Sequence, residues 1–189
     1  MKENSVAFMM PCSGPVDPRV LQSAIALASA ASQSGLTVCP VGITDRTLVH
    51  TARNILAEGF LKSGAEWGFW MDSDMLLPPQ TITVMLNWAL KLEALFLTGI
   101  YVQREGKHRP LILRRDSITI DGQEFQKWFD DDYAHNYCLP KPGTTIPFKV
   151  HTAGFGVMLT HRKMFELLPR PWFEFVKLPG GKKASEDFY

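Results

Sequence analysis

The chain has 189 residues, of which 46% are hydrophobic and 21% are charged, and its formal net charge is +1. These values predict one folded domain over 1–189, and they exclude a disordered chain and a protein that binds nucleic acid through bulk positive charge. The three cysteines have no paired spacing, so neither a disulfide framework nor a zinc site is indicated, and we expect a reduced, cytoplasmic protein. The apolar run 6–10 is too short for a signal peptide or a membrane segment.

The first half of the chain alternates short apolar runs with longer amphipathic segments. Strands are predicted over 5–10, 36–43 and 67–71, and helices between them over 18–33 and from 48 to about 63. A helix over 81–92 and a strand over 95–102 continue this alternation, which is typical of a mostly parallel sheet. We therefore expect an α/β fold with a nucleotide-binding type of architecture.

The ends and inner faces of the first two helices can also be predicted. Asp17 is expected to cap the first helix and Thr47 the second, and Gly35 and Gly64 are expected to end them in the left-handed conformation. The residues expected to face the core are Leu21, Ile25 and Ala28 in the first helix and Leu48, Ala52, Ile55 and Phe60 in the second.

The second half changes to short strands. Short strands are predicted over 110–114 and 117–120, and a separate apolar strand is predicted to end at Leu159. A short helix is predicted over 162–168. Asp121 and Gly122 form a strong hairpin turn, so the sheet is expected to become mixed. The aperiodic segment 128–147 is interpreted as a functional loop. We also expect the sequence to be cut short at its C-terminus, because it stops inside what resembles a further motif.

The most informative motif is the run 67–75, in which an apolar stretch ends in Asp72 and Asp74, separated only by Ser73. A strand here would place both carboxylates at the carboxyl edge of a parallel sheet, where ligands bind in open α/β folds. Two such carboxylates can hold Mg²⁺ or Mn²⁺ against the phosphates of a nucleotide. Acidic residues after a strand also serve as solvated turn formers, an interpretation that the preceding aromatic residues disfavour.

Several motifs in a fixed order resemble GT-A-fold glycosyltransferases, most of all family 2 and its bacteriophage-type relatives. They are the strand ending at Pro11, the helix with Arg53 and Asn54, the Asp72–Ser73–Asp74 motif, a Gly-x-Gly at 154–156, and Glu186 with Asp187. The resemblance implies a Rossmann-like three-layer GT-A sandwich with a mostly parallel, mixed sheet. It also implies a hexosyltransferase-like enzyme that uses a UDP- or GDP-linked sugar donor, a divalent metal and an unknown acceptor hydroxyl, and that inverts configuration.

The same resemblance assigns roles to individual residues. Asp74 would hold the metal, Asp72 would share it or contact the ribose, and His151 is a further candidate ligand. The residues implied on the nucleotide-sugar side are Pro11, Cys12, Asp45, Arg53, Asp72, Ser73 and Gly154. Asp187 would be the general base that deprotonates the acceptor, and Glu186 would orient it.

Alternatives stay open for single residues and for the function. Arg53 could be a surface cation paired with Glu58 or Asp45. Trp172 and Phe173 could stack on an acceptor sugar, although packing is favoured, at least for Phe173. The chain could also be a haloacid-dehalogenase-type phosphotransferase, which likewise places an Asp-x-Asp after an apolar strand, or a module that binds nucleotide sugar or glycan without turnover.

If the reaction inverts configuration, Asp187→Asn should abolish sugar transfer and spare donor binding, because an amide cannot accept the proton of the acceptor hydroxyl. Release of nucleoside diphosphate measures the first quantity and calorimetry the second. Loss of donor binding in this variant would instead assign Asp187 a structural role.

Overall fold

The computed structural model describes residues 2–12, 14–44, 48–101, 112–113, 116–120, 123–127, 147, 152–174, 176–177 and 183–184. The chain divides into two compact units, one formed by Met1–Gly99 with Phe155–Asp187 and the other by Ile100–Gly154 with Phe188–Tyr189. Among the helices in the described ranges, none combines the length and the apolar character needed to cross a membrane.

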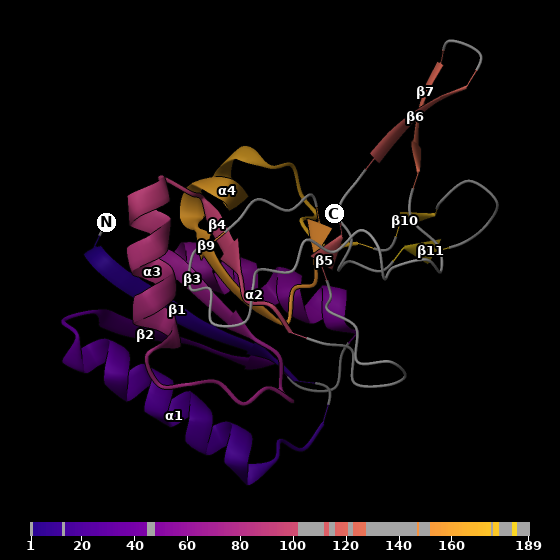
Figure 1. The fold of residues 1–189 in the computed structure, drawn as a ribbon. Coiled ribbons are helices and arrows are strands. Elements are labelled where there is room, and N and C mark those ends of the chain that lie inside the picture. The colour runs from indigo at the N-terminus through magenta and orange to yellow at the C-terminus, as the bar shows by residue number, and fades with distance from the viewer. Residues whose placement is uncertain are drawn as a thin grey trace. The chain divides into compact units, whose positions relative to one another are not determined.

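The first unit is built around a five-stranded mixed sheet (Figure 1). In sheet order, its strands are β2 (Thr37–Thr44), β1 (Lys2–Pro11), β3 (Ala65–Met71), β9 (Val157–His161) and β4 (Phe96–Thr98). Strand β1 is parallel to β2 and β3, whereas β9 is antiparallel to β3 and β4. The predicted α/β fold with a mostly parallel, mixed sheet is confirmed, although β4 is shorter than the predicted strand.

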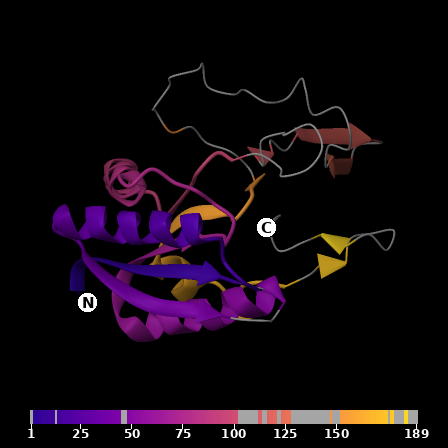
Figure 2. The same ribbon diagram turned by 90° about the horizontal axis from the view of Figure 1, so that it is seen from below.

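Helices cover both faces of this sheet (Figure 2). On one face lie α1 (Pro18–Gln33) and α3 (Thr81–Leu92), and on the other lie α2 (Val49–Ser63) and α4 (Arg162–Leu167). Strand β3 contributes to both cores in alternation, because Trp67, Phe69 and Met71 pack with α1 and α3 while Trp70 packs with α2 and α4. This alternation follows from the two-residue period of a strand, and it makes β3 the centre of the fold.

The remaining strands form short antiparallel pairs. Those of the second unit are β5 (Ile112–Leu113) with β8 (Thr152–Ala153) and β6 (Asp116–Ile120) with β7 (Gln123–Lys127), and those of the first are β10 (Val176–Lys177) and β11 (Lys183–Ala184). Ile120 lies opposite Gln123, the antiparallel pairing expected on either side of the predicted hairpin turn, whose residues 121–122 lie outside the described ranges. The predicted functional loop lies outside the described residues, apart from Pro147.

The ends of the first two helices largely follow the prediction. The Asp17 carboxylate accepts a hydrogen bond from the Arg19 amide at 2.8 Å. The side chain of Arg19 binds the same carboxylate and, with the amide, holds the pKa of Asp17 at about 2. Gly35 and Gly64 have φ angles of 85° and 73°, which confirms the two left-handed helix ends.

The inner face predicted for α1 is wrong, and that of α2 is only partly right: Ala52 and Phe60 are buried as predicted, but Leu48 and Ile55 are not, and the cap predicted at Thr47 is wrong. Leu21 and Ile25 are 41% and 69% exposed, and Leu48 and Ile55 are 67% and 54% exposed. The residues that α1 and α2 bury are Val20, Leu27 and Ala31 in the first and Ala52, Arg53, Leu56, Ala57 and Phe60 in the second. Helix α2 begins one residue later than expected, with Leu48 at its N-cap and no side-chain capping bond.

Strand β3 passes so close to its neighbours at Gly68 that a side chain would collide with them. A Cβ added there would lie 2.5 Å from Cε of Met9, 3.1 Å from Oγ1 of Thr160 and 3.2 Å from Cε1 of Phe60. The methionine end can move, but the Thr160 hydroxyl accepts a hydrogen bond from Nε1 of Trp70 at 2.9 Å and donates to the Gly68 carbonyl at 3.3 Å. The packed atoms around Gly68 therefore leave no room for a larger side chain.

We expect Gly68→Ala to lower the free energy of unfolding by about 1–3 kcal/mol through overpacking, as measured by urea denaturation. Gly14→Ala is the control, because no atom lies within 4 Å of its added Cβ, and its effect should stay below about 0.5 kcal/mol. Equal effects of the two variants would contradict this account of β3.

Candidate functional site

The candidate site lies at the carboxyl edge of the sheet, where β1 and β3 end side by side. Met9 of β1 lies opposite Trp70 of β3 in the parallel pairing. Beyond this pair, β1 continues to Pro11 and β3 to Met71, directly before Asp72. Cys12 follows Pro11 and is only 4% exposed. The structure thus gathers the first strand end and the Asp-x-Asp motif at one edge, as the sequence predicts.

The two carboxylates of the motif lie in a tight turn with different surroundings. The Asp72 amide donates to the Gly156 carbonyl at 2.8 Å, and the Met75 amide donates to the Asp72 carbonyl at 3.3 Å. Asp72 and Ser73 are half-buried, whereas Asp74 is exposed. The turn therefore presents Asp74 to solvent and directs Asp72 toward the protein.

Arg53 of α2 lies buried behind Asp72. Its side chain is 2% exposed, and its Nη2 donates to Oδ1 of Asp72 at 3.2 Å, while the Asp72 side chain is 31% exposed. The guanidinium carbon lies 4.9 Å from the centre of the Phe155 ring. The alternative of a surface cation is wrong, and Glu58 pairs with Arg170 at 3.4 Å.

Asn54, the neighbour of Arg53, holds a segment that is distant in sequence. Its Nδ2 donates to the carbonyls of Phe173, at 2.7 Å, and of His50, at 2.9 Å. Its Oδ1 accepts from the Trp172 amide at 3.0 Å. An asparagine in a helix interior is disfavoured unless its side chain finds such partners, so its position within the predicted helix is itself a signal of a contact to another segment.

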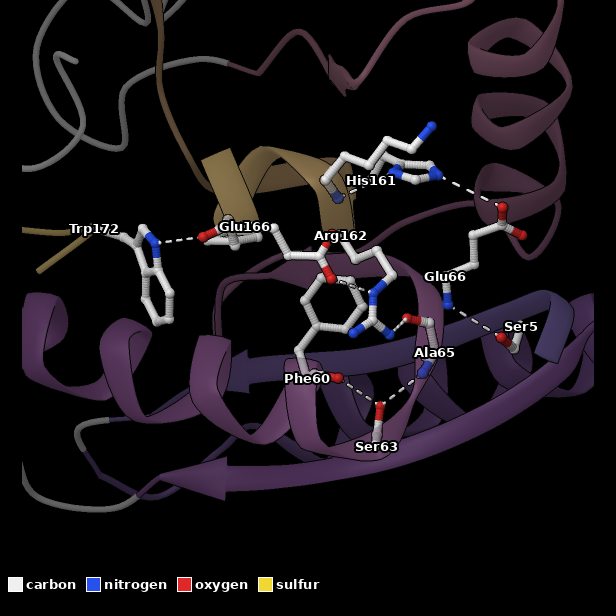
Figure 3. Close-up of polar contacts among 11 residues, drawn as sticks. Ser5, Phe60, Ser63, Ala65, Glu66, His161, Arg162, Glu166 and Trp172 are labelled. Carbon is white, nitrogen blue, oxygen red and sulfur yellow. Dashed lines mark hydrogen bonds and ion pairs between the residues drawn. The ribbon is translucent and has the colours of Figure 1, made fainter. Parts of the chain in front are cut away.

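The aromatic residues after α4 serve packing. Phe173 is 5% exposed, and its ring centre lies 5.0 Å from that of Phe155 and 5.8 Å from that of Trp70. Nε1 of Trp172 donates to the Phe165 carbonyl at 2.9 Å (Figure 3). The packing interpretation of Phe173 is confirmed, and the Trp172 indole is bound to α4.

A second polar cluster lies at the opposite edge of the sheet, where β3 starts (Figure 3). Arg162 donates to the Ala65 carbonyl at 3.1 Å and to Glu166 at 2.8 Å. Nε2 of His161 lies 3.5 Å from a carboxylate oxygen of Glu66. These contacts join the start of α4 to the start of β3, and we interpret the cluster as structural.

The structure does not test the positions of the other predicted site residues. Asp45, His151, Glu186 and Asp187 lie outside the described residues, and Gly154 belongs to the second unit. Within the described part of the chain, no three His, Cys, Asp or Glu side chains gather closely enough to hold a metal ion. The site as described therefore offers two neighbouring carboxylates, one paired with arginine and one exposed.

No protein-family model matches the chain, and no curated protein matches it. The functional interpretation therefore depends on the residues of this edge and their geometry.

The two carboxylates should differ sharply in their effect on stability. Asp72→Asn removes the negative charge that faces a buried guanidinium, so we expect the free energy of unfolding to fall by about 2–4 kcal/mol, less than for a fully buried pair because Asp72 is 31% exposed. Asp74→Asn should cost less than about 1 kcal/mol. Urea denaturation measures both, and a larger loss in Asp74→Asn than in Asp72→Asn would contradict the assignment.

Proposed function

We propose that this chain is a GT-A-type glycosyltransferase that moves a sugar from a nucleoside diphosphate to an acceptor hydroxyl, with inversion and with the help of a divalent metal. The observation that carries the proposal is the turn after β3, in which Asp72 pairs with buried Arg53 while Asp74 is exposed. The mixed, mostly parallel sheet with this turn at its carboxyl edge also supports the proposed function, because ligands bind at that edge in open α/β folds.

The ion pair gives the two carboxylates separate tasks. Arg53 faces Asp72 from the protein interior, whereas Asp74 is exposed, so its carboxylate can be reached from solvent. An exposed carboxylate oxygen is a ligand that Mg²⁺ and Mn²⁺ prefer. Asp74 would therefore be the principal metal ligand, and Asp72 would share the metal or contact the ribose.

Two carboxylates suit a metal that is bound together with its substrate. Mg²⁺ is usually held by one or two carboxylates, and waters and substrate phosphates complete its coordination. When bound, such a cation offsets the charge that develops on the departing diphosphate. The chain's own part is to fix Asp72 and Asp74 at the strand end and to border the nucleoside with Pro11 and Cys12.

The acceptor side of the proposal depends on the late carboxylates. Asp187 would take the proton of the acceptor hydroxyl as that oxygen attacks the sugar carbon, and Glu186 would orient the base. Direct displacement needs only one such base, which is consistent with an inverting reaction. Ser73 would complete the nucleotide-sugar side at this edge, and the family resemblance also implies roles for Asp45 and Gly154 there and for His151 as a metal ligand.

Titration calorimetry with UDP, GDP and their common sugar conjugates, with and without Mn²⁺, tests the proposal. We expect Mn²⁺-dependent binding, lost on chelation by EDTA and weakened at least about tenfold by Asp74→Asn. Because Asp74 is exposed, this variant should remain folded.

Glu93→Gln is the matched control, since it also removes one exposed negative charge. Glu93 follows the last residue of α3, a helix of 12 residues that is about 18 Å long, so it lies far from the turn. A folded wild-type chain that binds none of these nucleotides would overturn the proposal and favour the phosphotransferase or a module that binds glycan without turnover.

A further inference from the structure

The loop that carries Asp74 is fastened at both ends. At its start, Asp72 is held by the Gly156 carbonyl and by Arg53. At its far end, the hydroxyl of Ser23 donates to the Leu77 carbonyl at 3.1 Å and accepts from the Leu77 amide at 3.0 Å. One side chain of α1 thus satisfies both backbone groups of a loop residue, as a neighbouring strand would do in a sheet.

Ser23 occupies a place where packing alone would favour an apolar residue. It follows Val20 and precedes Leu27 at helical spacing, on the face that α1 turns toward the sheet. Serine is a poor choice for a helix interior, because it competes for backbone hydrogen bonds. Its reciprocal bonds to Leu77 supply a physical reason for its presence there.

We propose that Ser23 is a positioning residue for the metal-binding carboxylate of Asp74, an inference that rests on the proposed function. Only residues 73–76 separate the two anchored positions, so fixing Leu77 restricts the directions in which Asp74 can point. The side chains of Met75 and Leu77 pack against the core shared by α1 and α3, which strengthens the same restraint. A ligand held in advance in its binding geometry loses less conformational entropy when the metal and nucleotide bind.

The chain offers a matched control in Ser63. Its hydroxyl donates to the Phe60 carbonyl at 2.7 Å and accepts from the Ala65 amide at 3.2 Å (Figure 3). The bonding is of the same kind, but Ser63 is the last residue of α2, just before β3 begins, whereas Asp74 follows the other end of β3. Ser63→Ala therefore removes equivalent hydrogen bonds without touching the Asp74 loop.

The test compares wild type, Ser23→Ala and Ser63→Ala in two measurements. Calorimetry gives the affinity for Mn²⁺ with UDP or GDP, and hydrogen exchange reports the opening of residues 72–77. We expect Ser23→Ala to weaken the metal-dependent affinity about tenfold, as is usual when a group supporting a metal ligand is removed, and to speed exchange in this segment. Ser63→Ala should change neither quantity, and Ser23→Thr, which keeps the hydroxyl, should bind like wild type.

The possible failures are distinguishable. If wild type binds and the two alanine variants bind equally well, Ser23 has no positioning role. Equal losses in Ser23→Thr and Ser23→Ala would overturn the role of the hydroxyl, and so would unchanged exchange of residues 72–77 in Ser23→Ala. If wild type itself binds neither nucleotide with Mn²⁺, the proposed function fails and the inference falls with it. Alanine is a strong helix former, so Ser23→Ala should retain α1.

Discussion

The buried ion pair between Arg53 and Asp72 is the constraint on which the candidate site depends. A guanidinium that is 2% exposed is costly to bury unless a charge faces it, so the Asp72 carboxylate stabilises the packing of α2 on the sheet. The Asp72 backbone is bonded in turn to Gly156, at the start of β9. The pair of Arg53 and Asp72 therefore contributes both to the packing of the core and to the placement of the candidate functional turn.

Much of the fold could be predicted because its signals are local. Gly35 and Gly64 end helices in a conformation that glycine adopts without strain, and β6 and β7, on either side of the predicted turn, pair antiparallel as a hairpin signal predicts. The apolar run before Asp72 is short and aromatic, as a buried strand requires. The position of both carboxylates at the carboxyl edge of β3 followed from these local features.

The helix faces and the unequal surroundings of the carboxylates could not be predicted in this way. Arg53, Ser23 and Asn54 are polar residues that point inward, toward partners 19, 54 and 119 residues away. A hydrophobic pattern assigns polar residues to the solvent-exposed side of a helix. It therefore misplaces polar residues such as these, which point into the protein. Their positions depend on hydrogen bonds to residues far away in the chain, and such bonds produce no periodic pattern in a single sequence.

The order of the strands has a consequence for how such a protein can diversify. The chain leaves the sheet after β4 and returns to it at β9, and these two strands are neighbours, with Thr98 opposite Met158. Exit and return are thus about one strand spacing apart, near 5 Å. Whatever lies between them has only to begin and end at adjacent points, and lengthening a loop costs little. Insertions or replacements between 100 and 154 can therefore accumulate while the sheet, the ion pair and the Asp74 turn stay unchanged.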